Sequence, residues 1–114
     1  MDPDCLFCKI AAKKIPAKIL HEDADVFAFA DINPQAPTHI LLCPQKHFAS
    51  LNEASPEDQA LLGKLQLVAA DLARKHNLLP GYRTVINSGA GAGQTVFHLH
   101  VHLLGGREFA WPPG

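Results

Sequence analysis

The chain has 114 residues, of which 47% are hydrophobic and 18% charged, and its formal net charge is −1 with histidine neutral. This composition excludes a disordered chain and predicts one globular domain over residues 1–114, and the small net charge gives no indication of nucleic acid or a membrane surface as partner. The amino terminus lacks a signal-peptide pattern, no apolar run reaches transmembrane length, and three cysteines fit a reducing compartment, so we expect a cytoplasmic protein.

The first 44 residues predict one short helix and three strands. Asp4 can cap a helix from about Cys5 to Lys13, which stops near Pro16. A turn or loop is expected over Ile32–Pro37. Around it lie three strand-like runs, Lys18–Glu22, Val26–Ala30 and His39–Cys43, the last ended by Pro44.

The clearest predicted element is a long helix from Pro56 to about His76. Ser55 is a good N-cap, Asp58 has a capping-box position, and Pro56 suits the first helical position. The helix carries apolar residues at helical spacing: Leu61, Leu62, Leu65, Val68, Ala69 and Leu72.

The last third of the chain predicts a hairpin. Two strands, Tyr82–Asn87 and Phe97–Leu104, are joined by the short Gly-rich turn Ser88–Gln94, so we expect them to be antiparallel neighbours. Five strands with two helices outside the strand order predict an α+β fold.

Three histidines alternate with apolar residues in the segment His98-Leu99-His100-Val101-His102-Leu103-Leu104. On a strand, this alternation puts the three imidazoles on one face. Burying them without partners is costly, which favours a functional use: a nucleophile, a proton donor or acceptor, a phosphate contact or a metal site. One zinc ion held by all three is strained, because same-face positions lie about 6.5–7 Å apart along a strand.

The loop before this segment, Gly89–Thr95, is rich in glycine. Its backbone N–H groups could approach an anion closely, although a flexible hairpin loop has the same composition. It lacks the Gly-Lys-Ser/Thr ending of a Walker loop. Thr95 could place a hydroxyl beside the imidazoles.

Cys5-x-x-Cys8 supplies half of a metal site, and the same spacing fits two unrelated buried thiols. Candidate partner ligands are His39, His47 and His98. Asp31 follows an apolar strand and fits either a turn residue or a carboxylate that accepts hydrogen bonds from a ribose diol.

The histidine segment resembles the signature of the histidine-triad (HIT) superfamily, His-φ-His-φ-His-φ-φ. Further segments resemble the Hint branch of that family, and together they cover nearly the whole chain: Phe7-x-Lys9-Ile10, Ile15–Ile19, Asp31–His39, Gly105-Gly106-Arg107 and Trp111-Pro112-Pro113-Gly114. The resemblance implies a HIT fold, a five-stranded antiparallel sheet with two helices, that pairs into a homodimer.

The resemblance also implies an activity. The chain would be a purine nucleoside 5′-phosphoramidate hydrolase (an adenosine 5′-monophosphoramidase) that works through a covalent nucleotidyl intermediate on His100, with no catalytic cofactor. Its ligands would be purine nucleoside monophosphates and phosphoramidates. The residues implied at the catalytic positions are His100, His98, His102, His39 and Thr95.

The resemblance assigns further positions in this sequence. Nucleotide contacts are implied for Leu6, Phe7, Phe29, Asp31, Ile32, Asn87, Gly93, Gln94, Thr95, His100 and His102. A structural zinc site is implied for Cys5, Cys8, His47 and His98, which together make a closed four-ligand set. Trp111 would contact the partner subunit. Thr95, where the family often has Ser, and Ala110, where close relatives can be polar, depart from the pattern and bear on the leaving group.

Other functions remain open from the residues. A dinucleoside polyphosphate hydrolase of the same superfamily fits the triad, but the Gly105-Gly106-Arg107 segment and the tail argue against it. A galactose-1-phosphate type transferase would want Gln at the position of His102. A non-catalytic nucleotide-binding adaptor is disfavoured by intact residues at every catalytic position.

Overall fold

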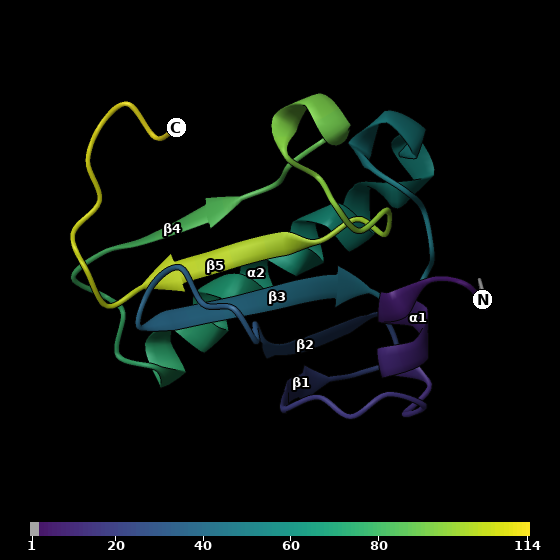
Figure 1. Ribbon diagram of the computed structural model, residues 1–114, viewed down its shortest axis with the longest axis horizontal. Coiled ribbons are helices and arrows are strands. Elements are labelled where there is room, and N and C mark those ends of the chain that lie inside the picture. Colours follow the sequence, from purple (N-terminus) through teal and green to yellow (C-terminus); the bar gives the residue numbers. More distant parts are fainter. Residues whose placement is uncertain (1–2) are drawn as a thin grey trace.

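The computed structural model describes residues 3–114, so the first two residues of the expected domain lie outside it. Its centre is one five-stranded antiparallel sheet in the order β1-β2-β3-β5-β4 (Figure 1). The strands are β1 (Ile19–Glu22), β2 (Val26–Ala30), β3 (Thr38–Pro44), β4 (Tyr82–Val85) and β5 (Val101–Gly105), and the helices are α1 (Leu6–Ala11) and α2 (Gln59–Lys75). The expected α+β class, the antiparallel five-stranded sheet with two helices and the β4–β5 pairing are confirmed.

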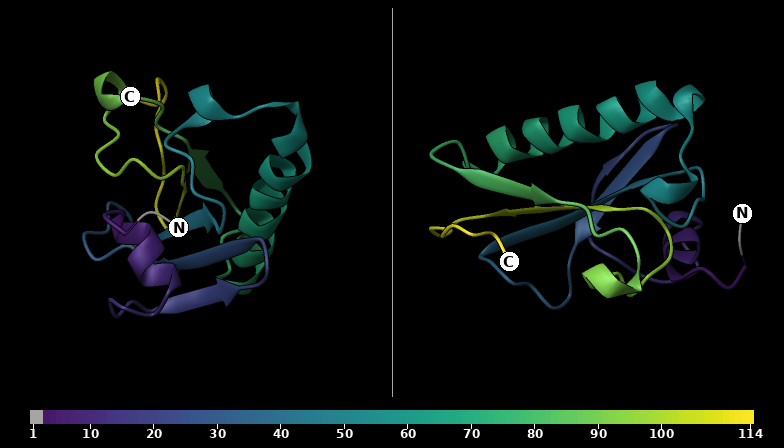
Figure 2. Two further views of the ribbon diagram at one scale, coloured as in Figure 1. Left: turned by 90° about the vertical axis from the view of Figure 1, so that its right-hand side faces the viewer. Right: turned by 90° about the horizontal axis from the view of Figure 1, so that it is seen from above.

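The two helices lie on opposite faces of the sheet (Figure 2). Alternate residues of β2 and β3 point to opposite sides. One set packs under α2 in a core that includes Val26, Ala28, Ile40, Leu42, Leu65, Leu72, Leu99, Val101 and Leu103. The other set packs under α1 in a core of Cys5, Phe7, Cys8, Ile10, Phe27, Phe29, Leu41 and Cys43. The histidine segment therefore has its apolar residues in the first core.

Helix α1 is shorter than expected and has a different cap. Its N-cap is Cys5, whose Sγ accepts a hydrogen bond from the backbone N–H of Cys8 at 3.3 Å. The prediction that Asp4 caps the helix is wrong, because the thiol takes that acceptor role. The helix ends before Lys13, whose φ of 63° is incompatible with continuing it.

The segment before α2 has the predicted capping box, in which the Asp58 carboxylate accepts from the backbone N–H of Ser55 at 3.0 Å. The first turn, Pro56–Asp58, is 3₁₀ rather than α, and the α-helix proper ends at Lys75. Pro44 does not end the third strand but is its last residue, opposite Val26. A proline is tolerated there because the strand end needs no further ladder donor.

The histidine strand is shorter than the predicted Phe97–Leu104. β5 begins only at Val101, and the backbone N–H of Leu99 donates instead to the carbonyl of Phe48 at 2.8 Å. The predicted strand Tyr82–Asn87 likewise ends at Val85, opposite His102. Two of the three histidines thus lie before β5 rather than within it, so the predicted strand bounds are wrong, although the alternation still holds, with Leu99, Val101 and Leu103 in one core.

None of the helices in residues 3–114 has the length and apolar character needed to cross a bilayer.

Candidate active site and metal cluster

His100 is held in one tautomer by the backbone. Its Nδ1 lies 2.7 Å from the carbonyl oxygen of His98. A carbonyl can only accept, so Nδ1 carries the proton and Nε2 keeps a free lone pair. Burial lowers the pKa of His100, with smaller opposing effects from the His98 carbonyl and from Asp31. The ring is therefore neutral at neutral pH, with its Nε2 lone pair free to accept a bond.

His102 is held in the opposite tautomer by a chain of hydrogen bonds. The backbone N–H of Gln35 donates to His39 Nδ1 at 3.0 Å, so the proton of neutral His39 is on Nε2. That N–H donates to His102 Nδ1 at 2.9 Å, which places the proton of His102 on its own Nε2. Within residues 3–114, this buried Nε2 has no hydrogen-bond partner. This series of hydrogen bonds thus ends in an unsatisfied N–H donor on His102.

Burial keeps the imidazoles of His39 and His102 neutral. It lowers the pKa of His102 to about 4, helped by the neighbouring His100 and His39 rings. It also lowers the pKa of His39, against a smaller opposing effect of the Asp31 carboxylate. The His100 and His102 ring centroids are 4.9 Å apart, so a free lone pair and a free N–H donor lie side by side.

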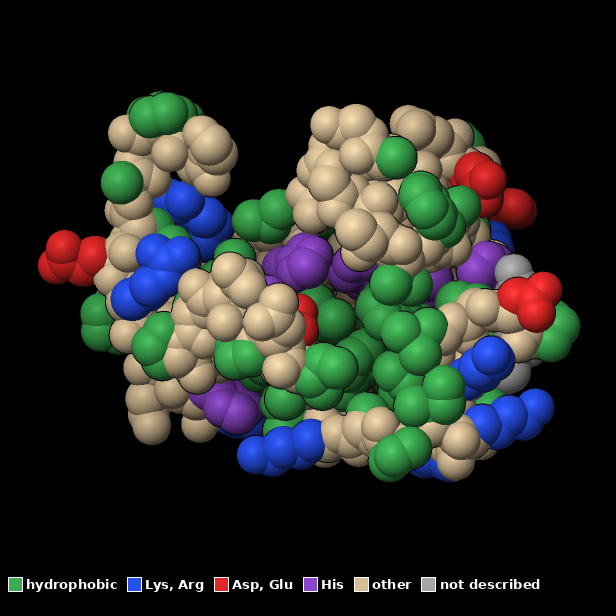
Figure 3. Space-filling view, viewed as in Figure 1, with side chains coloured by type: hydrophobic (Ala, Val, Ile, Leu, Met, Phe, Trp, Pro, Cys, Tyr) green, Lys and Arg blue, Asp and Glu red, His purple; other side chains and the backbone are tan. Residues whose placement is uncertain are grey.

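The Asp31 carboxylate lies at the edge of this histidine group. Its Oδ1 accepts from the backbone N–H of Asn33 at 2.8 Å, and its Oδ2 is 3.4 Å from His39 Nε2. The side chain keeps 18% of its surface exposed, so it can still accept hydrogen bonds from a ligand. In the space-filling view, histidine side chains gather along a hollow across the middle of this face, with an acidic side chain beside them (Figure 3).

The side chain of His98 belongs to a separate group, the thiol–imidazole cluster formed by Cys5, Cys8, His47 and His98. The fully buried His98 ring has its Nε2 2.8 Å from the carbonyl of Pro44, so Nε2–H donates and Nδ1 has a free lone pair. Burial lowers the pKa of His98 to about 4. Its Nδ1 is 3.3 Å from Cys5 Sγ, 3.6 Å from Cys8 Sγ and 3.1 Å from His47 Nδ1.

These distances fit a tetrahedral zinc ion. Zinc bonds of about 2.1 Å to nitrogen and 2.3 Å to sulfur separate neighbouring ligand atoms by roughly 3.3–3.8 Å. The observed separations, 3.1–3.6 Å including 3.4 Å between Cys8 Sγ and His47 Nδ1, are close to that range. The Pro44 carbonyl also supplies the outer hydrogen bond that zinc-binding histidines usually make. Of the three candidate histidine partners, His47 and His98 join the cysteines and His39 does not.

Two phenylalanine rings form an apolar wall beside His100, which we define as Phe7 and Phe29. The Phe7 ring meets the His100 ring edge-on at 5.0 Å between centroids and the Phe29 ring at 5.4 Å. Leu6 directly precedes Phe7 and keeps 43% of its surface exposed, and Ile32, three residues after Phe29, keeps 99%. The wall itself is buried, whereas Leu6 and Ile32 present apolar surface to solvent.

The Gly-rich loop is organised by a buried glutamine. The Gln94 side chain accepts from the N–H of Gly89 at 2.8 Å and donates to the carbonyls of Ala49 and Val96 at 2.6 and 3.1 Å. Gly93 adopts a left-handed φ of 93° at the end of the short helical turn, which favours glycine. The expected phosphate contacts of Asn87, Gly93 and Gln94 stay predictions. Thr95 is exposed and lines a hollow with Cys5, Leu6 and His47.

The mechanism implied by the resemblance calls for a backbone carbonyl beside Nδ1 of His100, but the sequence does not show which backbone groups set the tautomers. These groups are the carbonyls of His98 and Pro44 and the N–H of Gln35. Because every residue has such groups, only the tertiary structure can reveal which ones meet an imidazole.

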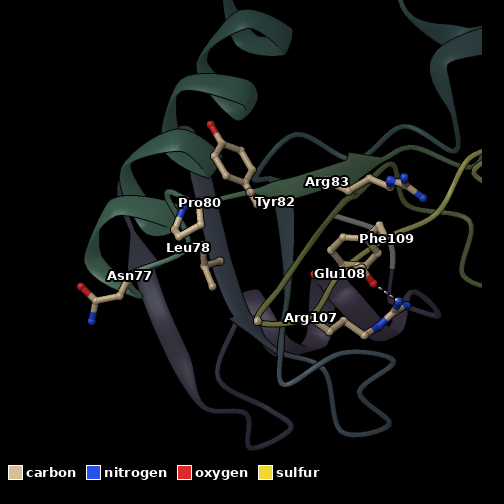
Figure 4. Close-up of a pocket in the computed structure, with 10 residues that line it drawn as sticks. Asn77, Leu78, Pro80, Tyr82, Arg83, Arg107, Glu108 and Phe109 are labelled. Atoms are coloured by element: carbon tan, nitrogen blue, oxygen red, sulfur yellow. Dashed lines mark hydrogen bonds between the residues drawn. The ribbon is translucent and has the colours of Figure 1, made fainter.

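A hollow of about 670 Å³ lies away from the histidines, beside β4 and the segment after β5 (Figure 4). Phe109 is flanked there by two guanidinium groups, Arg83 at 5.0 Å and Arg107 at 4.3 Å from its ring centroid. Arg83 also donates to the carbonyl of Ala110 at 2.9 Å. These contacts anchor the residues that lead to Trp111, which is 83% exposed.

Comparison with known proteins gives consistent matches. The family described as HIT domain matches residues 12–109. An uncharacterized HIT-like protein of Synechococcus elongatus is 54% identical over the full length of both chains, and Protein HitA of Neisseria gonorrhoeae is 53% identical over 90% of this chain and 95% of its own. The crystal structure of a HIT family hydrolase from Legionella pneumophila superposes with a TM-score of 0.95 at 50% identity, covering 97% of this chain and all of that one.

Proposed function

This chain belongs to the HIT domain family, and from that premise we propose that it is a purine nucleoside 5′-phosphoramidate hydrolase of the Hint type, with His100 as nucleophile. The observation that carries the proposal is the pairing of a free Nε2 lone pair on His100 with a free Nε2–H donor on His102. One group can attack phosphorus while the other stabilises a phosphate oxygen. A structurally similar protein is named a HIT family hydrolase, which supports hydrolysis at the coarse level.

The proposed reaction has two steps. His100 Nε2 attacks the α-phosphorus, a nitrogen–phosphorus bond forms, and the bond from phosphorus to the leaving amine breaks as the amine takes up a proton from solvent. Water then attacks the nucleotidyl-histidine and gives up a proton to solvent, which releases the nucleoside monophosphate and returns the electron pair to Nε2. The His98 carbonyl stabilises the positive charge that the ring carries in the intermediate, because it accepts from Nδ1–H at 2.7 Å.

His102 has the role of an oxyanion donor in this proposal. Its Nε2–H is buried and fixed by the Gln35–His39 hydrogen bonds, so it needs no reorientation when charge develops on the phosphate. Phosphoryl transfer depends mostly on positioning and on charge stabilisation, which this arrangement supplies. Backbone N–H groups of the Gly-rich loop and the Thr95 hydroxyl are proposed as further phosphate contacts.

The nucleoside is proposed to bind beside the apolar wall. The purine ring would pack against Phe7 and Phe29 with Leu6 and Ile32 at its edges, and the ribose hydroxyls would donate to the Asp31 carboxylate. The Asn33 N–H holds that carboxylate in place. This arrangement predicts nucleoside monophosphate binding even without a leaving group.

The thiol–imidazole cluster is proposed to hold a structural zinc ion. When bound, zinc would supply a four-ligand link between α1, His47 and His98 and no chemistry at phosphorus, because all four coordination positions belong to the protein. Burial raises the pKa of the Cys5 thiol, so zinc binding must displace the proton from its sulfur atom.

A homodimer is proposed from the edge of the sheet. β4 is an outer strand with one unpaired side, and α2 next to the sheet exposes 70% of Leu67. A second copy would pair with that edge and cover the exposed leucine. The contacts of Arg83 and Arg107 with Phe109 would then present Trp111 to the partner subunit.

The test is to trap the intermediate. Wild-type protein is mixed with an adenosine phosphoramidate, quenched with acid within milliseconds and analysed by mass spectrometry for an adenylyl group on His100, with His100→Ala as control. We expect the adduct in the wild type and none in the variant. Turnover without an adduct would refute the mechanism. Preference for a diadenosine polyphosphate would establish the alternative hydrolase, and AMP binding without turnover would establish an adaptor.

A further inference from the structure

We propose that Cys5 and Cys8 are positioning residues of the nucleotide site: metal binding at the thiol–imidazole cluster fixes helix α1 and thereby holds Leu6 and Phe7 in place beside His100. This inference rests on the proposed function of the site. It goes beyond a general stabilising role for zinc, because it predicts that ligation is read out as nucleotide affinity.

The first observation is the order of residues in the chain. Leu6 and Phe7 are the only residues between the two cysteines, and all four open the helix. A helix of six residues is far too short to be stable by its own hydrogen bonds. Its position must therefore come from tertiary contacts, which are made by the cysteines of its first turn and by the buried Phe7 and Ile10 side chains.

The second observation is where those contacts lead. Cys5 and Cys8 are 8% and 1% exposed, and their sulfur atoms face the Nδ1 of His98 at 3.3 and 3.6 Å. Thiols are weak hydrogen-bond partners, so without a metal these contacts hold the turn only loosely. A bound zinc ion would replace them with two metal–sulfur bonds from one helical turn.

The third observation is the ring contact on the other side of that turn. Phe7 is 4% exposed and meets His100 at 5.0 Å and Phe29 at 5.4 Å between ring centroids. A rotation of α1 that released Phe7 would remove one side of the apolar wall and expose the His100 ring. The two cysteines that flank Leu6 and Phe7 in the sequence therefore contribute to the order of the wall.

His98 makes the link direct. Its side chain faces the cysteines, while its main-chain carbonyl accepts the Nδ1–H of His100 at 2.7 Å. Metal binding at one end of this residue fixes the carbonyl that orients the proposed nucleophile. This link acts on the chemical step, whereas loss of the apolar wall acts on binding. We expect metal loss to weaken nucleotide binding more than it slows the chemical step, because the wall depends directly on α1.

The experiment compares zinc-loaded and chelated wild-type protein. Zinc content is measured by mass spectrometry and AMP affinity by calorimetry. Backbone hydrogen exchange is followed in the peptides that cover α1 and α2. We expect zinc removal to weaken AMP binding at least tenfold and to speed exchange in α1, while α2 is unchanged. With an adenosine phosphoramidate as substrate, KM should rise more than kcat falls.

Variants separate positioning from simple stability. Cys5→Ser with Cys8→Ser should lose zinc and show the weak AMP binding of the chelated protein, whereas Cys43→Ala, which changes a buried thiol outside the cluster, should keep both. Phe7→Ala should lose AMP affinity but retain zinc. If the double cysteine variant does not fold, the comparison of zinc-loaded and chelated wild-type protein still tests the proposal.

Three results would overturn the proposal: no zinc bound by the wild type, AMP affinity unaffected by zinc removal, or equal loss of hydrogen-exchange protection in α1 and α2. The last result would mean that the metal stabilises the whole domain and not α1 in particular. Failure of the proposed function has a different signature. In that case the zinc-loaded wild type neither binds AMP nor forms an adduct, although α1 exchange can still respond to the metal.

Discussion

The carbonyl oxygen of His98 accepts a hydrogen bond from Nδ1–H of His100 at 2.7 Å, while the side chain of His98 points to the cysteines. One residue thus contributes its backbone to one site and its imidazole to another. Two histidines that are two positions apart have different partners, different tautomers and different proposed roles.

The hydrogen bond from His39 to His102 predicts a specific loss of rate. His39→Leu removes the donor that fixes the His102 tautomer, so we expect kcat to fall about 100-fold with little change in KM. His39→Gln keeps an N–H that can reach His102 and should retain more activity. Rapid-quench measurement of adduct formation checks both. Equal activity of the leucine and glutamine variants would argue that this hydrogen bond has no catalytic role.

The lowered pKa of His102 predicts how stability depends on pH. Folding lowers this pKa from 6.5 to about 4, so the unfolded chain binds more protons between these values and the free energy of unfolding falls as the pH drops from 6.5 toward 4. The contribution is up to about 1.4 kcal/mol per pH unit. Urea unfolding at pH 7, 6 and 5 should show a shallower dependence for His102→Gln than for the wild type. His76→Gln, at the exposed end of α2, should match the wild type.

A cluster around Asp23 predicts a stability effect without an effect on chemistry. Its carboxylate accepts from His21, from the backbone N–H of Val26 and from Lys64 on α2, at 2.7–3.1 Å. These contacts hold the pKa of Asp23 well below its usual range despite partial desolvation. Asp23→Ala should lower the free energy of unfolding by about 1–2 kcal/mol, measured in urea, with kcat unchanged.

Asp71→Ala is the matched control for that variant. Asp71 pairs with Arg74 on the exposed surface of α2, and we expect a change below about 0.5 kcal/mol. If the two variants lose equal stability, the connection between the β1–β2 turn and α2 is not important for folding.

Gly106, directly after β5, predicts a backbone effect. Its φ is +89°, and a Cβ there would lie 2.9 Å from the Cβ of Pro37. Gly106→Ala should therefore destabilise the protein by about 1–3 kcal/mol, measured by urea unfolding. Gly81→Ala, where an added Cβ meets nothing within 4 Å, should change stability little, and comparable losses in both would contradict the strain argument.

Much of the fold could be predicted because local signals agreed with the tertiary structure. The Ser55–Asp58 capping box and the apolar spacing that follows it predicted α2, and the short Gly-rich turn predicted the β4–β5 pairing. The helix cap at Cys5 could not be predicted, because a thiol becomes the acceptor only when burial brings it to that turn.

The predicted length of the histidine strand was wrong for a similar reason. Alternation of apolar residues extends to Leu99, and the apolar side chains do lie in one core. The ladder nevertheless stops at Val101, because the N–H of Leu99 finds its partner at Phe48. Side-chain periodicity reports which face is buried, not which strand supplies the hydrogen bonds.

The sequence by itself determined the α+β class through periodicity, the residue types at the candidate site, and, through a contiguous motif, the resemblance to the family. The tertiary structure alone decided which nitrogen of each histidine carries the proton and which partner each ring meets. Those features depend on the carbonyls of His98 and Pro44 and the N–H of Gln35. Backbone groups are the same in every residue, so their selection is a property of the folded chain and cannot be read from side-chain identities.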